Sequence, residues 1–545
     1  MKKRILKLAM TVASALTLGA CSWLAEPTPA MITLDDYFAG AGGAGCIYTV
    51  NACYVPLCWE FNNSYFPEWF IGDVVSDDAL KGGEAVRAAM TYVYLLENFK
   101  TIADNEMLLD MYRANYQGIG RCNMALSRIV DVEPDTIMDE RTKARLLGEC
   151  YYLRAYYYFR LVRIFGGVPI TTTVLDDPAN NKLERATADQ VYDQIIDDLT
   201  LAEESLWTRS DAGYTKADLG RATKGAAQAM LQKVYLYKKD FTKSKEWGDK
   251  VIESGEYDLI ANYKENFYLQ GENNIESVFE IQYSNEASSD YGSTNAHLGA
   301  TRGTFTTILT RGREYGGWGW NHPTQNLYDE FEENDARLQA TIFDPVKFQV
   351  LDEYLGIKYY NAKTGMYNED GSDVAVKLGH DSRGELNKKE IRFSDVLLMR
   401  AEAAAELGDL TTAKTDLERV RLRARCYALA LDTANVLDSL SLVPEFPNYS
   451  FKENGIASQE VTPTDDQTGL IKAIRHERRV ELGMESHRWF DLCRWGTAKE
   501  VMNTYRENES EAVRAEMNPM QDHHYLFPIP PKEIELNPMA QNPGY

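Results

Sequence analysis

Two stretches, YLYKKDFTKSKEWGDKV at residues 235–251 and AEAAAELGDLTTAKTDLERV at residues 401–420, share one plan and decide the fold. In each of them, apolar residues recur at helical spacing on both sides of a short turn. The turns fall at Lys239-Asp240 and at Gly408-Asp409. Each stretch is therefore predicted to form two helices joined by a tight turn.

Small residues stand at matching positions in the second helix of each stretch. Ser244 follows bulky Phe241 by three residues, and Ala413 follows Leu410 in the same way. Small side chains let two helices approach, and bulky ones fill the groove, as in a tetratricopeptide-like helix pair. Because one pair cannot bury its apolar face alone, several must stack. The sequence predicts a mainly α fold, a tetratricopeptide-like α-solenoid scaffold with irregular loop-rich insertions and few short strands.

The rest of the chain divides into helical and irregular stretches. Helical spacing covers residues 77–206, and the helices at 154–170 and 188–206 are the natural partners of the repeated pairs. Residues 285–389 are rich in Gly, Asn, Tyr, Thr and Trp, which is typical of loops and short strands. Residues 432–467 are irregular too. Helical spacing resumes at Gly469, and a proline-punctuated tail is expected to lie extended over the surface.

Residues 1–20 have the composition of an export signal. A basic head precedes the apolar run at residues 8–18, which is too short to span a bilayer. Small residues precede Cys21, as a lipoprotein signal peptidase requires. Cys21 is therefore predicted to be the acylated first residue of the mature protein, tethered to a membrane without a spanning helix. An ordinary secretory peptide followed by an incidental cysteine is the alternative.

The charge of the chain argues against nucleic acid as a partner. The formal net charge is −24, and loss of the four basic residues of the signal takes it to −28. Affinity for nucleic acids rests mainly on clustered Lys and Arg. Anionic polysaccharides are also disfavoured, unless a local basic pocket overrides the net value.

Three neighbouring cysteines and one acidic segment are the places where a disulfide or a metal site could form. Cys46, Cys53 and Cys58 lie close together, so either two of them form a disulfide that tightens a loop or all stay free thiols. No zinc site is expected, because no histidine stands near them and no CxxC spacing exists. Residues 368–373, NEDGSD, offer oxygen donors for calcium but are also typical of a solvated hairpin turn.

Enzyme motifs are missing from the sequence. It contains no HExxH, GxSxG or phosphate-loop motif, and no GxGxxG opening a helix after a strand. His476 and His487 lack a third ligand at helical spacing and are expected to be structural. No enzyme activity and no cofactor are predicted, although two carboxylates that meet in space could still form a glycoside hydrolase.

The string GLIKAIRHERRVELGMESHRWFDLCRWG, residues 469–496, closely resembles the C-terminal signature of the SusD/RagB family. Residues 220–259, 274–284, 393–409 and 526–545 resemble further family blocks, in family order. The resemblance covers essentially the whole mature chain. One departure is Ser486, where the family usually has Gly.

The resemblance implies a tetratricopeptide-containing lipoprotein on the exterior of the outer membrane. It implies partnership with a SusC-like TonB-dependent β-barrel transporter, over which the protein closes as a lid. Family ligands are mostly glycans and in some members peptides. A hydrolase and a pure assembly scaffold are the other functions considered.

The predicted organisation follows from these features. It comprises a signal peptide at 1–20, an N-terminal tether and loop region at 21–76, a SusD-like helical region at 77–284, a loop-rich ligand-binding insertion at 285–389 and a SusD-like C-terminal region at 390–545 that completes the scaffold.

The signature string is expected to form a structural network. Three- and four-residue spacing predicts one helical ladder of opposite charges, made by Arg478, Glu481, Glu485, Arg488 and Asp491. Its aromatic residues Trp489, Phe490 and Trp495 are predicted to fill the core.

Sugar binding requires apolar ring faces and planar polar groups, so exposed aromatic residues on loops are the candidates. One cluster lies near the N-terminus and another in the central insertion, with Arg302, Arg311, Arg313 and Asn321 as polar neighbours. The predicted ligand contacts are Trp59, Tyr65, Trp69, Tyr291, Arg302, Tyr315, Trp318, Trp320 and Asn321.

Overall fold

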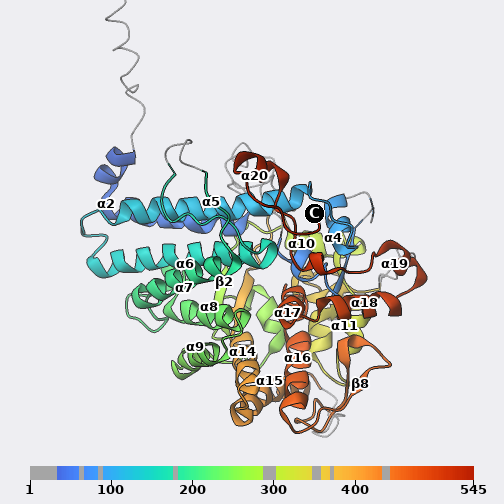
Figure 1. Cartoon of the computed structure of the whole chain (residues 1–545). Helices are drawn as coiled ribbons and strands as arrows, with labels where there is room; N and C mark the ends of the chain where they lie inside the picture. Colours follow the sequence, from blue (N-terminus) through green and yellow to red (C-terminus); the bar gives the residue numbers. More distant parts are fainter. Residues whose placement is uncertain are drawn as a thin grey trace, which may run out of the picture.

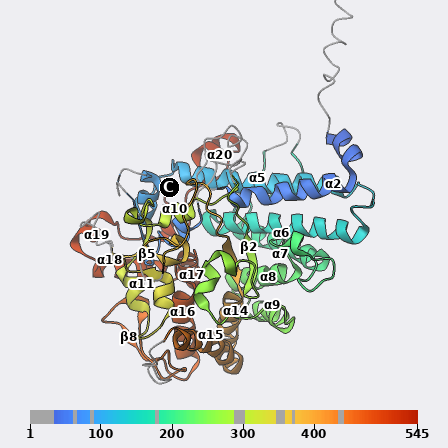
Figure 2. The same ribbon diagram turned by 180° about the vertical axis from the view of Figure 1, so that it is seen from behind.

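The computed structural model describes residues 34–59, 67–83, 87, 90–175, 182–286, 302–345, 358–368, 373–432 and 442–545. The signal peptide and Cys21 lie outside the described residues. Figures 1 and 2 show a mainly helical molecule with few short strands, which confirms the predicted fold class. Among the described residues, no helix is both long enough and apolar enough to cross a membrane.

A continuous stack of helices forms the scaffold. Its members are α5 (Glu106–Ile129), α6 (Glu140–Phe165), α7 (Ala188–Ser205), α8 (Lys224–Tyr237), α9 (Phe241–Glu253), α14 (Phe393–Glu406), α15 (Leu410–Leu431) and α16 (Gln467–Leu482). Each packs on the next from α5 to α9, then α9 packs on α14, and α14 on both α15 and α16. In Figure 1 the stack descends from α5 to α15. We call these eight helices the helix stack.

The two repeated stretches form helix pairs, as predicted. The first is α8–α9 and the second α14–α15, and α9 lies directly against α14 although a long insertion separates them in sequence. Ser244 and Ala413 are fully buried where the helices meet. The carboxylates of Asp240 and Asp409 each accept a hydrogen bond from a backbone N–H in the first turn of the following helix, which fixes where it begins.

Helix α6 ends where the sequence predicts. Gly166 follows Phe165 with a φ of 72°, a conformation that L side chains rarely adopt. Pro169 then forms an isolated bridge with Arg185 in place of further helix. The glycine and proline therefore terminate this long helix as expected.

The N-terminal region differs from the prediction. Residues expected as tether and loop form α2 (Leu34–Tyr54), which packs against α5 and α6. Its glycines hide the helical spacing, and Gly42 is non-helical with a φ of 51°. Cys46 and Cys53 are buried on this helix, and they and Cys58 are free thiols. The structure therefore agrees with the free-thiol alternative, and these three cysteines form no disulfide.

Two-stranded ribbons and short helices lie outside the helix stack, and the insertion contains part of them. The ribbons pair β1 (Ala79–Gly82) with β3 (Trp320–Pro323), β2 (Ser277–Ile281) with β6 (Lys388–Arg392), β4 (Ile342–Phe343) with β5 (Tyr360–Asn361) and β7 (Phe451–Lys452) with β8 (Glu460–Val461), all antiparallel. The short helices are α10 (Thr306–Thr310), α11 (Gln325–Glu330), α12 (Arg337–Thr341) and α13 (Ala362–Gly365). The β1–β3 ribbon joins the N-terminal region to the insertion.

The predicted charge ladder is wrong as a single helix. Helix α16 ends at Leu482 and α17 (Arg488–Trp495) begins after a break in which Met484 and Ser486 have φ values of 64° and 69°. Arg478 still pairs with Asp491, but Arg488 pairs with Asp77. The charges form a structural network with distant segments, so their helical spacing does not mark one helix.

The remaining elements cover the ends of the helix stack. They are α3 (Trp69–Gly72), α4 (Thr91–Glu97), α18 (Ala498–Asn508), α19 (Glu511–Glu516) and α20 (Pro531–Leu536). Trp489 and Phe490 are buried in the core, and Trp495 is half-buried against it. The tail is anchored to the end of α6, where the N–H of Phe527 donates to the carbonyl of Ile164 at 2.9 Å. It is extended except at α20, which the sequence did not predict.

Candidate functional site

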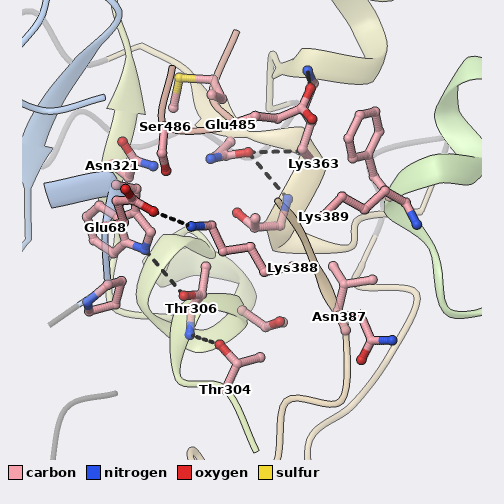
Figure 3. Close-up of a pocket in the computed structure, with 18 of the residues that line it drawn as sticks. Glu68, Thr304, Thr306, Asn321, Lys363, Asn387, Lys388, Lys389, Glu485 and Ser486 are labelled. Carbon is pink, nitrogen blue, oxygen red and sulfur yellow. Dashed lines mark hydrogen bonds and ion pairs between the residues drawn. The ribbon is translucent and has the colours of Figure 1, made fainter. Parts of the chain in front are cut away.

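A hollow of about 710 Å³, counting its open mouth, lies where five segments of the chain converge. These segments are residues 67–69, 304–307, 361–364, 386–389 and 484–486, joined by Asn266, Phe267, Tyr283 and Asn321. We call this the central hollow, and Figure 3 shows its wall. The space inside it that the centre of a water molecule can reach is about 80 Å³, so the hollow is narrow.

Secondary structure positions each part of the wall. Trp69 opens α3, Thr306 opens α10, and Lys388 opens β6. The break between α16 and α17 supplies Glu485 and Ser486, because its left-handed residues turn the chain out of the helix. The helical spacing of the signature concealed this break, so Glu485 was not predicted to line a site.

Lys388 and Glu68 form an ion pair in the wall of the hollow (Figure 3). The Nζ of Lys388 lies 2.9 Å from Oε2 of Glu68 and 2.6 Å from Oε1 of Glu390. Burial opposes ionisation of Glu68, but Lys388 and Arg163 outweigh it and lower the pKa of Glu68 to about 2. Glu68 is therefore a carboxylate at neutral pH, with two cations beside it.

Lys363 and Glu485 form a second ion pair in the wall. The Nζ of Lys363 lies 2.6 Å from Oε1 of Glu485, and Nε of Arg392 lies 2.8 Å from the other oxygen. Burial lowers the pKa of Lys363 to about 8. Burial also opposes ionisation of Glu485, but Arg392 and Lys363 outweigh it and lower its pKa to about 2.

Lys389 is the third lysine of the wall. It pairs with Glu280 and donates to the carbonyl of Gly271 at 3.1 Å. Asn387, its neighbour in the wall, donates to Glu280 at 3.1 Å and to Gln282 at 3.0 Å, and accepts from the N–H of Tyr283 at 2.8 Å. These polar groups are fixed by partners that lie behind the surface of the hollow.

Aromatic and aliphatic side chains supply the apolar part of the wall. Trp69 is 4% exposed, and its indole N–H donates to the hydroxyl of Thr306 at 3.3 Å. Phe267, Leu386 and Met484 are buried beside the hollow, and Tyr283 is half-buried. The sequence did not single out Tyr283, although it is the next-to-last residue of one of the family blocks.

Two amides of the wall have a polar atom without a partner. Oδ1 of Asn321 and Nδ2 of Asn361 are buried and have no hydrogen-bond partner among the described residues. The other amide atom of each is used. Asn321 donates to Asp73 at 3.2 Å, and Asn361 accepts from the N–H of Lys363 at 3.0 Å as the N-cap of α13. Buried polar groups without partners are uncommon, and these two atoms have hardly any accessible surface, so a ligand reaches them only if part of the wall moves.

The chain matches two family profiles and many solved structures. The profile described as "SusD family" matches residues 275–545, and one described as "Starch-binding associating with outer membrane" matches residues 75–236. The chain belongs to the SusD family.

Relatives of this SusD-family chain are distant but similar in length. "SusD-like protein P2" of Formosa agariphila is 26% identical over 485 residues, covering 83% of each chain. A "SusD-like protein" of Bacteroides ovatus is 26% identical over 430 residues, covering 73% of this chain and 67% of the relative.

Solved structures share the fold over most of its length. A "Laminarin binding SusD-like protein" superposes with a TM-score of 0.72 at 25% identity, covering 92% of this chain and all of that one. "Surface glycan-binding protein A" of Bacteroides thetaiotaomicron, solved in complex with laminarihexaose, superposes with a TM-score of 0.69 at 23% identity, covering 92% of this chain and 99% of that one.

The predicted ligand contacts of this SusD-family chain are distributed unevenly. Trp69 and Asn321, from the two separate clusters, both line the central hollow. Trp318 is half-buried, and Arg302 is exposed on the insertion, 3.5 Å from Glu286. Tyr65 and Tyr291 lie outside the described residues.

The expectation of an exposed ring is wrong for Trp69, which is buried although it lines the hollow, and for three further aromatic residues. Trp59 is 5% exposed beneath the guanidinium of Arg121, Trp320 is 4% exposed beneath the Nζ of Lys81, and Tyr315 is 6% exposed in a cluster of aromatic rings. Composition alone does not distinguish a loop tryptophan from one in a ribbon such as β3. These three rings fill the interior.

The histidines of the signature are structural in this SusD-family chain. His476 lies between Glu330 and Glu332, at 2.9 and 3.1 Å, and these bonds outweigh burial and raise its pKa to about 9. Burial lowers the pKa of His487 to about 4. No cluster suited to a metal ion occurs in the part of the chain that the structure describes.

The calcium alternative lies largely outside the described residues. Residues 369–372 are not among them, and at their borders the N–H of Asn368 donates to the carbonyl of Asp373 at 2.9 Å. An isolated bridge between Tyr367 and Val374 closes the same turn. These contacts pair the residues on either side of 369–372, and calcium stays the alternative to the hairpin turn that the sequence predicts.

Proposed function

We propose that this chain is a cell-surface lipoprotein that captures glycans or oligosaccharides at the central hollow and delivers them to a SusC-like TonB-dependent transporter. The observation that carries the proposal is the meeting of Trp69 and Asn321, from two distant segments, in one hollow. Its wall combines apolar rings with amides and hydroxyls, which a pyranose needs for its CH face and its hydroxyl edge.

Trp69 and Tyr283 are the rings we assign to the sugar, with Asn321 and Asn361 as polar contacts. A laminarin-binding protein that shares the fold at a TM-score of 0.72 supports a glycan as the ligand class. Contacts by Tyr65, Tyr291, Arg302 and Trp318 stay predictions for parts of the ligand beyond the wall of the hollow.

Binding is tested with the protein from residue 22 onward on affinity gels that contain a broad panel of polysaccharides. Retardation by at least one of them is expected. Tyr283→Ala should weaken it several-fold, because loss of one aromatic contact removes on the order of 1 kcal/mol. Tyr151→Ala is the matched control, since Tyr151 is a half-buried tyrosine on α6 that does not line the hollow. No retardation by any polysaccharide, or equal losses in the two variants, contradicts the proposal.

Attachment through Cys21 to the outer membrane, facing the exterior, is the second part of the proposal. The signal at residues 1–20 and the family profile named for association with the outer membrane support it. Cys21→Ser should abolish incorporation of labelled palmitate and release the protein from outer-membrane fractions. Retention of the label by the variant contradicts the anchor.

Partnership with the transporter is tested by affinity purification of the tagged full chain from detergent-solubilised outer membranes. A TonB-dependent β-barrel is expected in stoichiometric amount. Recovery of the full chain alone, under conditions that preserve other outer-membrane complexes, contradicts the lid role.

Hydrolysis at the central hollow is disfavoured by its electrostatics. A glycosidase needs a carboxyl group that keeps its proton near neutral pH to act as the general acid. Glu68 and Glu485 instead have pKa values of about 2, because cations adjoin both of them. The relatives named above are SusD-like or glycan-binding proteins, and these names do not support the peptide alternative.

A further inference from the structure

We infer that the central hollow selects uncharged sugar units and rejects units that carry carboxylate or sulfate groups. This inference rests on the proposed function, because it specifies the ligand of the same site. It follows from how the charges of the wall are paired and from which polar atoms remain unpaired.

Every lysine of the wall already has a carboxylate partner. Lys363 pairs with Glu485, Lys388 with Glu68 and Glu390, and Lys389 with Glu280. An anionic sugar would have to displace one of these carboxylates to reach an ammonium group. It would leave the displaced buried carboxylate without its cation, which is strongly unfavourable.

The carboxylates of the wall are equally well matched. Glu68 also pairs with Arg163, and both oxygens of Glu485 are bonded to the guanidinium of Arg392. Cations and anions therefore balance over short distances. A second carboxylate or a sulfate brought into this hollow would meet two carboxylates and would lose its own hydration.

The unpaired atoms of the wall are neutral and of both kinds. Oδ1 of Asn321 is an acceptor and Nδ2 of Asn361 is a donor. A sugar hydroxyl donates one hydrogen bond and accepts others, so it suits either atom. An ionised carboxylate or sulfate only accepts, and it leaves Asn321 without a donor.

Other amides of the wall are bonded to the protein at both ends, unlike those of Asn321 and Asn361. Asn266 donates to Glu276 at 3.1 Å and accepts from Asn274 at 3.1 Å, so both ends of its amide are used by the protein. Asn387 is bonded at both ends as well. The wall thus contains amides bonded at both ends and two amides that each have one buried atom without a partner among the described residues.

The decisive test compares one polysaccharide with its own oxidised derivative. The neutral polysaccharide that the protein retains best is oxidised at its primary hydroxyls to uronate, and both forms are titrated into the protein from residue 22 onward. At least tenfold weaker binding of the oxidised form is expected at 0.15 M salt. Equal or tighter binding overturns the inference and leaves the proposed function intact. Failure of every polysaccharide, neutral or acidic, overturns the proposed function instead.

Two variants and one control test the roles of the unpaired amide and of the paired charges. Asn361→Ser keeps a cap for α13 and removes the unpaired donor, so about fivefold weaker binding of the neutral form is expected. Asn123→Ser is the control, because Asn123 is a buried amide on α5 that is bonded at both ends and does not line the hollow, and it should leave affinity unchanged. Glu68→Gln removes one carboxylate beside Lys388 and Arg163 and should reduce the discrimination against the oxidised form by several-fold. Unchanged discrimination in Glu68→Gln, with an unchanged melting profile, contradicts the charge argument.

Discussion

The helix stack and the wall of the central hollow are built on different principles. In the stack, neighbouring helices meet through small and apolar residues whose spacing along the chain is regular, such as Ser244 and Ala413. In the wall, side chains from five separate segments are joined by ion pairs whose partners lie far apart in sequence. Close packing therefore makes the scaffold, and charge pairing between distant segments makes the site.

The largest loss of stability is expected for a substitution of Arg392, which lies where the helix stack meets the wall of the central hollow. This buried arginine pairs with Glu276, Glu481 and Glu485, so it links strand β6, in which the insertion ends, to the end of α16. Arg392→Ala leaves these carboxylates without one of their cations, and we expect a loss of about 3–5 kcal/mol in the free energy of unfolding. Urea denaturation followed by circular dichroism measures it. A loss below about 1 kcal/mol would mean that packing alone holds the insertion in place.

Close packing in the stack is tested by two glycines of the same helix. A Cβ on Gly118 of α5 would collide with the ring of Tyr157, whereas a Cβ on Gly120 meets nothing within 4 Å. Gly118→Ala should destabilise the protein by about 1–3 kcal/mol. Gly120→Ala should stabilise it by about 0.5–1 kcal/mol, because alanine favours the helix. Thermal melts of both variants decide the matter, and similar shifts in the two would refute tight packing between α5 and α6.

Asp73, which lies behind the wall of the central hollow, makes the stability of the protein depend on pH. Burial, with Asp78 beside it, raises the pKa of Asp73 to about 7. Between about pH 4 and pH 7 the folded protein therefore holds a proton that the unfolded chain has released, so this group makes stability fall as pH rises, by about 1.4 kcal/mol per pH unit.

Asp73→Asn removes this titration. The amide of Asn321, which donates to Asp73 at 3.2 Å, can turn to accept from the new side chain. The stability of the variant relative to the unaltered protein should rise from pH 5 to pH 8, as measured by urea denaturation at each pH. A constant difference across that range would place the pKa of Asp73 near its ordinary value.

The smallest effect is expected for an ion pair on the surface. Lys499 lies 2.9 Å from Asp522, and both side chains are largely exposed to solvent. Lys499→Ala should change the free energy of unfolding by less than about 1 kcal/mol, and less still in high salt. An effect comparable to that of Arg392→Ala would show that ion pairs matter in this protein irrespective of burial.

Much of the scaffold is predictable from the sequence because helix packing repeats along the chain. The turns at Asp240 and Asp409, the small residues behind them and the glycine after α6 each act within one helical turn. Helix α2 is the exception, because its glycines dilute the apolar spacing that marks a buried face.

The central hollow is far less predictable for a physical reason. Lys388 and Glu68 are ordinary charged residues until the fold brings them together, and no local spacing relates them. Charges at helical spacing in the signature even point to the wrong partners, since Arg488 pairs with Asp77. Trp69 and Asn321 were found through their chemistry, whereas Trp59 and Trp320 have the same chemistry and are buried elsewhere.

The C-terminal tail supplies hydrogen bonds to the end of helix α6, which is synthesised long before the tail. Asn542 donates to the carbonyls of Phe165, at 3.0 Å, and Phe527, at 2.6 Å, while Arg185 donates to the carbonyl of Ala540 at 2.8 Å. Helix α6 leaves the ribosome early, but its last carbonyls find these partners only after residues 540–542 have been synthesised. A nonsense mutation or a proteolytic cut near the C-terminus is therefore expected to destabilise the end of α6, which lies in the first third of the protein.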